Sequence, residues 1–387
     1  MTDSSSSATP QLAFCLYKYF PFGGMQRNFL RIARECVQRG ARVRVYVLDW
    51  QAEDKPDNLE IVMVPKKGLS NPARYRFYSE WVQAHLRANP VDAVVGFNKM
   101  PGLDVYYAAD PCYAEKARSL RGWWYRYSSR YRHFIEYERA VFAAPSKTIL
   151  MLLSHPERDI FDSYYRIDPD RIVMLPPGIS REFVPDASAP SRRQALRDEL
   201  GLGADQVLLV QVGSDFERKG VDRSLRALAA LPAQQRVRVR FVVIGQASAS
   251  RMQRLARSLG VDGQTDFIGG SNRVPDFLLA ADLLLHPAYH ENTGNVILEA
   301  MVSGLPSIVT RICGYSPYLE QAQCGVVLEA PYQQEDFDRA LARAVAEPAL
   351  RRQWADNARH YADNADIYSR IQRAADVIMN RANANDA

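Results

Sequence analysis

The sequence has few cysteines and no long apolar run. Its five cysteines are an odd number, widely spaced and free of any C-x-x-C pair: Cys15, Cys36, Cys112, Cys313 and Cys324. This spacing argues against a zinc or redox motif and predicts buried, reduced thiols in the cytosol. No stretch of about eighteen apolar residues occurs, and the start MTDSSSSATP lacks the basic-then-apolar pattern of a secretory signal. We therefore expect neither export nor a membrane-spanning helix.

Length and composition indicate a globular protein with two α/β domains of similar size. The chain has 387 residues, of which 47% are hydrophobic and 24% charged. The net charge of +5 is unevenly distributed, because residues 1–175 carry 25 basic and 19 acidic side chains and the remainder carries 24 and 25. Residues 116–139 alone hold seven basic and two acidic side chains. This local excess predicts an anionic partner.

The first half begins with the pattern of a nucleotide-binding α/β domain. The apolar run at 12–16 predicts a buried strand, and Gly23 and Gly24 open a predicted helix at about 25–39. Helical patterns separate most of the later predicted strands, which favours a parallel sheet. Those strands are predicted at 43–48, 61–64, 93–95, 105–108, 148–152 and 172–175.

The second half repeats this alternation after a Pro/Gly/Ser-rich segment at 176–190, which is interpreted as an interdomain linker. Strands are predicted at 207–212, 240–244, 265–268, 283–286, 307–309 and 325–328, and a last helix at about 367–379. We expect a disordered leader, an N-terminal domain, a C-terminal domain and a final helix that packs back on the N-terminal domain. Their predicted ranges are 1–10, 11–178, 179–365 and 366–387.

One candidate phosphate site follows the predicted strand that ends at Val212. Gly213 comes next, and Arg218 and Lys219 precede a predicted helix. Glycine lets the backbone approach a phosphate, a helix N-terminus offers unpaired N–H groups, and two cations balance a diphosphate. An Arg-Lys pair in a solvated turn is the alternative interpretation.

A second candidate site holds two glutamates. Glu291 lies in HENTG, which follows the apolar segment LLLHPAY and opens a predicted helix that carries Glu299. If the segment is helical throughout, the two carboxylates lie roughly 12 Å apart, enough to reach both ends of a sugar diphosphate. The backbone N–H groups of Thr293, Gly294 and Asn295 would then face the phosphates. A capped surface helix with two ordinary glutamates is the alternative.

Together, these sites resemble those of a known enzyme family. The spacing of Glu291 and Glu299 matches the E-x7-E motif of retaining glycosyltransferases of family 4, which have the GT-B fold of two facing Rossmann-like domains with a deep interdomain cleft. Six segments, spread over nearly the whole chain after the leader, resemble the lipopolysaccharide core heptose glucosyltransferase I family: FCLYKYFPFGGMQ (14–26), VVGFNKMPGLDVYYAAD (94–110), LPPGI (175–179), GSDFERKGVDRS (213–224), LLLHPAY (283–289) and NARHYAD (357–363).

The resemblance implies a reaction and a set of donor contacts. That family transfers glucose from UDP-glucose to an inner-core heptose of lipopolysaccharide, with retention, in outer-core biosynthesis. It implies Glu291 at the glucose hydroxyls, Glu299 at the ribose and Arg273 near the uracil. It also implies the diphosphate at Arg218 and Lys219, with a loop of Gly23 and Gly24 closing over it. Family members differ in the segment between the two glutamates, which starts at Asn292, and the resemblance implies that this segment lines the sugar pocket.

No metal ion or other cofactor is expected. Asp168-Pro169-Asp170 superficially matches a D-x-D metal motif but is interpreted as a turn before a strand. His286 and His290 lack a third ligand at metal spacing, and Arg218 with Lys219 would make a metal redundant.

The acceptor is expected to contact the first domain. Lys99 and Asp104 follow a predicted strand there, and the resemblance places their loop at the interdomain cleft. Asp104 is a candidate for positioning the heptose hydroxyl, and a capping or turn role is the alternative. Retention without a covalent intermediate would let the departing phosphate oxygen accept the acceptor's proton, so no carboxylate nucleophile is required.

A basic aromatic segment spans residues 112–142. Its candidate membrane residues are Lys116, Arg121, Trp123, Trp124, Arg126, Arg130 and Arg132. Cations with interfacial rings fit an anionic membrane surface. A partly buried helix and a single-stranded nucleic-acid site are the alternatives. The glycolipid acceptor implied by the resemblance favours the membrane, so we expect a cytoplasmic protein at the inner face of the bacterial inner membrane and no nucleic-acid partner.

Other functions remain open from the sequence. One is a family 4 transferase with another UDP-sugar or acceptor. Another is a GT-B UDP-N-acetylhexosamine epimerase, which would require catalytic carboxylates and a histidine in a different arrangement. A non-catalytic glycolipid-binding module is the third.

Overall fold

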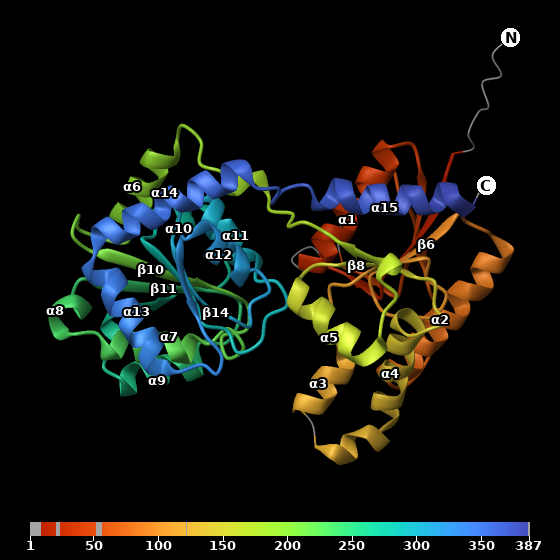
Figure 1. The fold of residues 1–387 in the computed structure, drawn as a ribbon, viewed down its shortest axis with the longest axis horizontal. Helices are drawn as coiled ribbons and strands as arrows, with labels where there is room; N and C mark the ends of the chain where they lie inside the picture. Colours follow the sequence, from red (N-terminus) through yellow and green to blue (C-terminus); the bar gives the residue numbers. More distant parts are fainter. Residues whose placement is uncertain (1–8, 21–23, 52–55, 121, 386–387) are drawn as a thin grey trace, which may run out of the picture. The chain divides into compact units, whose positions relative to one another are not determined.

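The structure is a computed structural model that describes residues 9–20, 24–51, 56–120 and 122–385. The chain divides into two compact units. The first comprises Met1–Pro177 and Ser369–Ala387, and the second comprises Gly178–Tyr368. In Figure 1 the last helix, drawn in blue, therefore lies among the red and orange elements of the first unit.

The first unit is built on a seven-stranded sheet with parallel pairings. In sheet order the strands are β5 (Glu60–Met63), β3 (Arg42–Val47), β1 (Gln11–Cys15), β6 (Ala93–Gly96), β7 (Val105–Tyr107), β8 (Ile149–Leu152) and β9 (Ile172–Met174). A separate two-stranded pair consists of β2 (Lys18–Tyr19) and β4 (Asp49–Trp50). Both faces of β1 are buried, since Leu12 and Phe14 enter one core and Ala13 and Cys15 the other. Burial on both faces explains the continuous apolar runs of the central strands.

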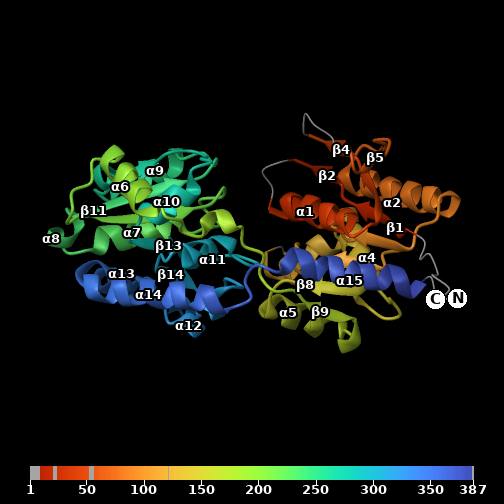
Figure 2. The same cartoon turned by 90° about the horizontal axis from the view of Figure 1, so that it is seen from above.

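Helices cover both faces of this sheet (Figures 1 and 2). Helices α1 (Gly24–Gln38) and α15 (Arg370–Asn385) pack on one face, and α2 (Asn71–Ala88), α4 (Ser129–Phe142) and α5 (His155–Tyr165) pack on the other. The remaining helical segments are α3 (Tyr113–Leu120), η1 (Trp123–Tyr127) and η2 (Pro169–Arg171). The buried residues Phe29, Ile32, Ala33 and Cys36 recur at helical spacing on α1, which gives it one apolar face.

The second unit has a six-stranded sheet, also with parallel pairings. In sheet order the strands are β12 (Thr265–Phe267), β11 (Val239–Ile244), β10 (Val207–Val212), β13 (Leu283–His286), β14 (Ser307–Thr310) and β15 (Gly325–Leu328). This is the 3-2-1-4-5-6 order of a Rossmann fold. The order reverses between β10 and β13.

Two helical layers cover the second sheet. One face carries α6 (Ala189–Glu199), α10 (Val274–Ala280), α11 (Asn295–Val302), α12 (Ser316–Ala322) and α14 (Pro348–Asn364). The other carries α7 (Val221–Ala230), α9 (Ser250–Ser258) and α13 (Gln334–Ala346). Shorter segments are α8 (Ala233–Arg236), η3 (Arg181–Phe183) and η4 (Asp262–Gln264).

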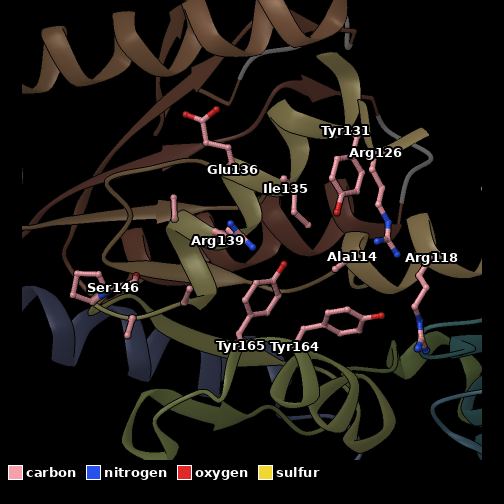
Figure 3. Close-up of a pocket in the computed structure, with 14 residues that line it drawn as sticks. Ala114, Arg118, Arg126, Tyr131, Ile135, Glu136, Arg139, Ser146, Tyr164 and Tyr165 are labelled. Atoms are coloured by element: carbon pink, nitrogen blue, oxygen red, sulfur yellow. The ribbon is translucent and has the colours of Figure 1, made fainter. Parts of the chain in front are cut away.

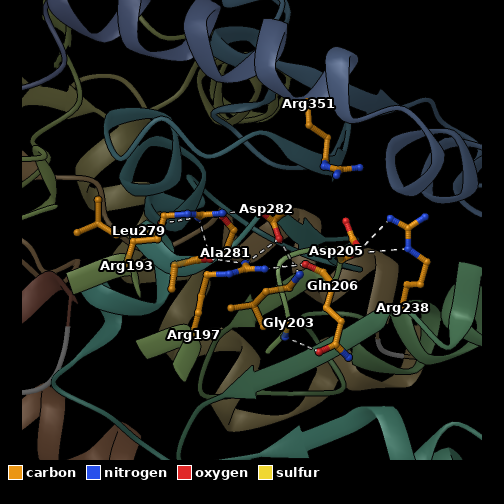
Figure 4. Close-up of polar contacts among 12 residues, drawn as sticks. Arg193, Arg197, Gly203, Asp205, Gln206, Arg238, Leu279, Ala281, Asp282 and Arg351 are labelled. Atoms are coloured by element: carbon orange, nitrogen blue, oxygen red, sulfur yellow. Dashed lines mark hydrogen bonds and ion pairs between the residues drawn. The ribbon is translucent and has the colours of Figure 1, made fainter. Parts of the chain in front are cut away.

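Arginines of α6 fasten this helix to the rest of the second unit (Figure 4). Arg193 donates to the carbonyls of residues 279–281, each at 2.8 Å, and so caps the end of α10. Arg193 and Arg197 both pair with Asp282, at 2.7 and 3.0 Å. The same carboxylate accepts a hydrogen bond from the backbone N–H of Leu208 at 2.8 Å. This network joins α6, α10 and β10.

The predicted sheets are confirmed, but the predicted linker at 176–190 was largely wrong. Ile179 and Phe183 are buried in the core of the second unit, and α6 begins at Ala189. The division between the units falls after Pro177. The segment lacks periodicity because it packs through isolated side chains and a short 3-10 turn rather than through a regular face.

Candidate donor site

The two glycine-containing loops of the second unit meet where its strand order reverses. Strands β10 and β13 are neighbours, with Leu209 opposite Leu283, and their connections lead to opposite sides of the sheet. In open α/β sheets, ligands bind beyond the carboxyl ends of the strands at such a point. Residues 213–220 and 287–294 follow these two ends. The topology therefore brings both sequence-predicted constellations to one place.

The two loops are held together through their backbones. The N–H of Tyr289 donates to the carbonyl of Arg218 at 2.8 Å. Gly220 has a φ of +72°, and a Cβ there would lie 2.1 Å from the carbonyl oxygen of Pro287. Any side chain at position 220 would therefore separate the loops.

Gly213 has a comparable steric role. A Cβ built on Gly213 would lie 2.8 Å from Cγ of Lys219, so the glycine leaves room for the lysine stem. The carbonyl of Gly213 in turn lies close to Gly245, where a Cβ would approach it to 1.9 Å. The loops after β10 and β11 thus leave little space for a side chain at positions 213 and 245, and Lys219 lies along the first loop.

Four ionisable side chains gather between the loops. Lys219 forms an ion pair with Glu291, and Arg218 Nη1 lies 3.7 Å from Glu291 Oε1. His286 Nε2 lies 3.5 Å from Glu291 Oε2. Lys219 and His286 are buried, whereas Arg218 is partly exposed. The site therefore presents two cations and one carboxylate at the carboxyl end of the sheet.

The protonation states follow from these contacts. Burial alone would raise the pKa of Glu291, but its polar contact with His286 and the charge of Lys219 outweigh burial and lower the pKa to about 2. Glu291 is therefore ionised at neutral pH. Burial lowers the pKa of His286, and the positive charges of Lys219 and Arg218 oppose its protonation further, so its imidazole is neutral.

The condition of a continuous helix from Glu291 to Glu299 is not met. Helix α11 begins at Asn295, because Gly294 adopts a left-handed φ of +82° that ends the helical path. Glu291 lies in the loop, while Glu299 lies half-buried on the helix. The roughly 12 Å separation assumed a straight helix and does not apply. The helix still directs its first backbone N–H groups toward the segment that carries Glu291.

The residues between the two glutamates belong to the same loop. Asn292, Thr293 and Asn295 are half-buried. The carbonyl of Thr293 accepts a hydrogen bond from the N–H of Tyr315 at 2.9 Å. This bond ties the loop to the segment that precedes α12.

Arg223 supports this loop and was missed in the sequence. Its guanidinium lies between the rings of Tyr289 and Tyr332, at 3.6 and 3.7 Å from their centroids. It also donates to the carbonyls of Pro287 and Ala288 at 3.0 and 3.1 Å. No local pattern signals this arrangement, because Tyr332 lies more than a hundred positions away. Arg223 fixes the path of the chain that leads to Glu291.

The other predicted donor residues have varied surroundings. Arg273 pairs with Glu199 at 2.9 Å and lies 3.6 Å from Asp276, in the loop after β12. Gly24 is the exposed first residue of α1, and Gly23 lies outside the described residues. Arg273 would have to exchange carboxylate partners to contact a base.

Asp104 and Lys99 are both engaged in contacts within the first unit. Asp104 accepts hydrogen bonds from the N–H of Val94 at 2.9 Å and from Arg381 at 3.1 Å. It precedes β7, so it lies at the amino end of the strand, away from the edge where ligands of such sheets bind. Lys99 pairs with the buried Glu138 at 2.5 Å. These contacts favour the turn interpretation of Asp104 over the acceptor-positioning one.

The described part of the chain contains no group of three or more His, Cys, Asp or Glu side chains suited to a metal ion. The predicted Asp-Pro-Asp turn is confirmed. The carboxylate of Asp168 accepts from the N–H of Asp170 at 3.1 Å, and β9 starts at Ile172. All five cysteines are buried and unpaired, as predicted.

Comparison with known proteins identifies the family. Residues 22–183 match the model of Glycosyltransferase Family 4, and residues 192–361 match that of Glycosyl transferases group 1. The lipopolysaccharide glucosyltransferase WaaG of Escherichia coli (strain K12) is 48% identical over 367 residues, which are 95% of this chain and 98% of that relative. The chain belongs to the WaaG family of glycosyltransferases. A crystal structure of WaaG has a TM-score of 0.88 to this structure and covers 95% of this chain and 99% of its own.

The fold extends beyond close relatives of WaaG. The Anabaena protein HepE, solved in complex with UDP-glucose, has a TM-score of 0.71 at 16% identity, with 96% of this chain and 100% of that chain covered. At this identity the likeness shows a shared fold. The predicted GT-B fold, two Rossmann-like units with parallel sheets, is confirmed for this WaaG family member.

The basic aromatic segment of this WaaG family member divides into a buried part and an exposed part. Within α4, His133, Tyr137 and Glu138 are buried. Trp123 and Trp124, in η1, are 74% and 67% exposed. The buried-helix interpretation therefore applies to α4, and η1 presents large rings to solvent. None of the helices in the described residues combines the length and the apolar character needed to cross a membrane.

A cavity of about 820 Å³ is lined by residues of this segment (Figure 3). Three arginines from α3, η1 and α4 line it, namely Arg118, Arg126 and Arg139, together with Tyr131, Tyr164 and Tyr165 among others. Lys116, Arg130 and Arg132 lie on the neighbouring turns, and Arg121 lies outside the described residues. The first unit therefore carries a positively charged, ring-bordered surface in this segment.

Proposed function

We propose that the protein transfers glucose from UDP-glucose to an inner-core heptose of lipopolysaccharide, with retention at the anomeric carbon. The observation that carries the proposal is the cluster of Lys219, Arg218 and Glu291 at the reversal point of the second sheet. Such a cluster offers cations for a diphosphate and a fixed carboxylate for sugar hydroxyls. The relative that shares 48% of its residues is named as a lipopolysaccharide glucosyltransferase.

In this proposal each end of the donor has its own contacts. Lys219 and Arg218 bind the diphosphate, and the first N–H groups of α11 add to the positive field. Glu291 accepts hydrogen bonds from the glucose hydroxyls, which requires the ionised carboxylate that its lowered pKa provides. Glu299, about one turn along α11, accepts from the ribose hydroxyls. Arg273 contacts the uracil.

The proposed transfer needs no covalent intermediate. The bond between the anomeric carbon and the phosphate oxygen breaks, and the heptose oxygen bonds to the same face of the sugar. The heptose proton passes to the departing phosphate oxygen. Lys219 and Arg218 stabilise the negative charge that develops on UDP, and such preorganised charges are the main source of rate enhancement in many enzymes. We propose that they replace a metal ion, so a chelator should leave turnover unchanged.

We further propose that the basic aromatic segment docks the enzyme on the inner face of the bacterial inner membrane. Arginines near an anionic surface each contribute about 1 kcal/mol of attraction. The exposed rings of Trp123 and Trp124 suit the membrane interface. Docking there would bring the acceptor domain to its glycolipid.

A panel of labelled donors tests this function. Purified protein is incubated with UDP-glucose, UDP-galactose or UDP-N-acetylglucosamine, with and without heptose-terminated lipopolysaccharide, and products are separated. Glucose transfer that depends on the acceptor supports the proposal. Preferential transfer of another sugar would show that UDP-glucose is not the donor. An epimerised sugar without transfer would indicate an epimerase, and no turnover would indicate a binding module. Turnover that falls in EDTA and returns with a divalent cation would contradict metal independence.

A further inference from the structure

His286 is a buried polar residue for which strand formation gives no reason. It is the last residue of β13, and its exposed fraction is 0%. Its strand neighbours Leu283, Leu284 and Leu285 are all apolar and buried. Among the described residues, neither ring nitrogen has a hydrogen-bond partner within normal geometry. Burying an unpartnered polar group is costly, so an apolar side chain would stabilise this position better.

The nearest polar atom to the imidazole belongs to the proposed sugar-binding carboxylate. Nε2 of His286 lies 3.5 Å from Oε2 of Glu291, slightly beyond a normal hydrogen bond. A small rotation of the carboxylate would close this gap. The groups that face the pair are Lys219 and Arg218 from the loop after β10 and Cys313 from the segment after β14.

The partner of Glu291 must change when a donor binds, if the proposed function is correct. In the structure, Lys219 pairs with Glu291. A diphosphate carries more negative charge than one carboxylate and would compete for the same ammonium group. Glu291 is nearly buried, so its negative charge needs a nearby partner. If the diphosphate takes the ammonium group of Lys219, Glu291 loses most of this partner's stabilisation at the moment when it binds the sugar. A neutral N–H donor buried beneath it can remain in place, because the diphosphate cannot reach it.

We propose that His286 is a positioning residue for glycosyl transfer, which donates its Nε2–H to Oε2 of Glu291 and leaves Oε1 to accept from the donor sugar. This inference rests on the proposed role of Glu291 at the sugar. In this role His286 takes over from Lys219 as the hydrogen-bond donor to Glu291 when the donor sugar nucleotide binds. The imidazole itself touches neither donor nor acceptor.

Two variants separate this role from simple packing. His286→Phe keeps a planar ring but removes the donor, and His286→Gln restores an N–H donor at a similar distance along the side chain. Loss of one hydrogen bond to a charged group corresponds to about tenfold or more in kcat. We expect that loss in the Phe variant and recovery of most of the activity in the Gln variant. The exposed His360 on α14 supplies a matched control, and His360→Gln should behave as wild type.

Ligand affinity and a second mutation complete the test. UDP lacks the sugar, so its Kd in titration calorimetry should be unchanged in His286→Phe, while any extra affinity for UDP-glucose over UDP should fall. In a Glu291→Gln background, His286→Phe should cause little further loss of kcat, because both changes remove one interaction.

Three results would overturn the inference. One is wild-type kcat in His286→Phe while the wild type transfers glucose, which would leave the proposed function intact. Another is an equal loss of UDP affinity and unfolding temperature in both variants, which would indicate packing only. The third is a wild-type protein that binds no UDP-sugar more tightly than UDP, in which case the proposed function fails as well.

Discussion

Replacement of Lys219 by methionine should separate charge from packing at the donor site. Methionine keeps an apolar stem beside Gly213 and removes the ammonium group that pairs with Glu291. Loss of one preorganised charge partner typically lowers turnover by about two to three orders of magnitude. We expect this reduction in kcat with UDP-glucose and acceptor.

The same change should destabilise the second unit moderately. Removing one partner of a buried ion pair costs about 3–5 kcal/mol when nothing replaces it. Here Arg218 remains 3.7 Å from Glu291. Because the Arg218 side chain is partly exposed, water can screen the charge of the Glu291 carboxylate. We therefore expect a cost below that range.

The acid dependence of stability should also change in this variant. The lowered pKa of Glu291, about 2, gives wild-type stability that is present above about pH 4.5 and lost as the pH falls toward 2. Without Lys219 the pKa of Glu291 should rise, so less stability is lost over this interval.

Initial rates of UDP release and urea unfolding measure the two effects. Lys219 is the only lysine after Lys147, so its substitution can be verified on a unique peptide. The matched control is Arg343→Met, which removes an exposed cation on α13 and should change neither quantity noticeably. Turnover in Lys219→Met within about threefold of wild type would refute the assignment of this lysine to the leaving group.

Three further predictions concern other parts of the molecule. Glu299→Gln should raise the KM for the donor more than it lowers kcat, because ribose contacts are equal in the ground and transition states. Glu291→Gln should mainly lower kcat. Steady-state kinetics of the two variants measure this difference. Neutralising Arg126, Arg130 and Arg132 together should weaken binding to anionic vesicles by about 1 kcal/mol per charge near the surface, as measured by co-sedimentation at low salt. His133→Phe should reduce the loss of stability in acid, measured as the unfolding temperature at pH 7 and pH 5.

The sign of the His133 prediction follows from its pKa. Burial, with a smaller contribution from the charge of Arg76, lowers this pKa to about 4. The unfolded chain, with a pKa near 6.5, therefore binds the proton better, and stability present above pH 6.5 is lost toward pH 4 at up to about 1.4 kcal/mol per pH unit. Phenylalanine at position 133 removes this contribution to the pH dependence of stability. The buried His286 still contributes, so some pH dependence remains. An unchanged pH dependence in His133→Phe would contradict the assignment.

For the membrane segment, salt distinguishes the two contributions. Added salt should weaken wild-type binding, since charges act over only about 8 Å at physiological ionic strength. Substitution of Trp123 and Trp124 should remove a component that salt leaves intact. Transfer to a water-soluble acceptor fragment should survive both changes. Equal absence of binding by wild type and the triple arginine variant would show that the segment is only structural.

The strands of both sheets were predictable because parallel strands buried on both faces consist of continuous runs of apolar residues. The predictions for 207–212, 283–286 and 325–328 match β10, β13 and β15 in every residue. The start of α11 was not predictable from helical spacing, because Gly294 can either continue a helix or interrupt it, and its left-handed conformation depends on the packing of the loop.

Contacts between distant segments could not be predicted from the sequence for a different reason. Arg223 is one arginine among many until the fold brings Tyr289 and Tyr332 to its two faces. Asp104 looked like an acceptor-side carboxylate because the loop that carries it follows a strand, yet the turn before β7 and the return of α15 place it between Val94 and Arg381. Such roles depend on tertiary pairing rather than on local pattern.

Transfer of labelled glucose by wild type and by Glu291→Gln in parallel preparations tests the proposed reaction and its site together. Both proteins receive UDP-[14C]glucose and heptose-terminated lipopolysaccharide, and the lipid fraction is counted before and after digestion with an α-glucosidase. We predict acceptor-dependent label that the α-glucosidase releases in wild type, and at most a small fraction of that label in the variant at the same folded concentration. Equal labelling by both proteins, or no labelling by wild type under conditions where it binds UDP-glucose, would contradict the proposed donor site and transfer.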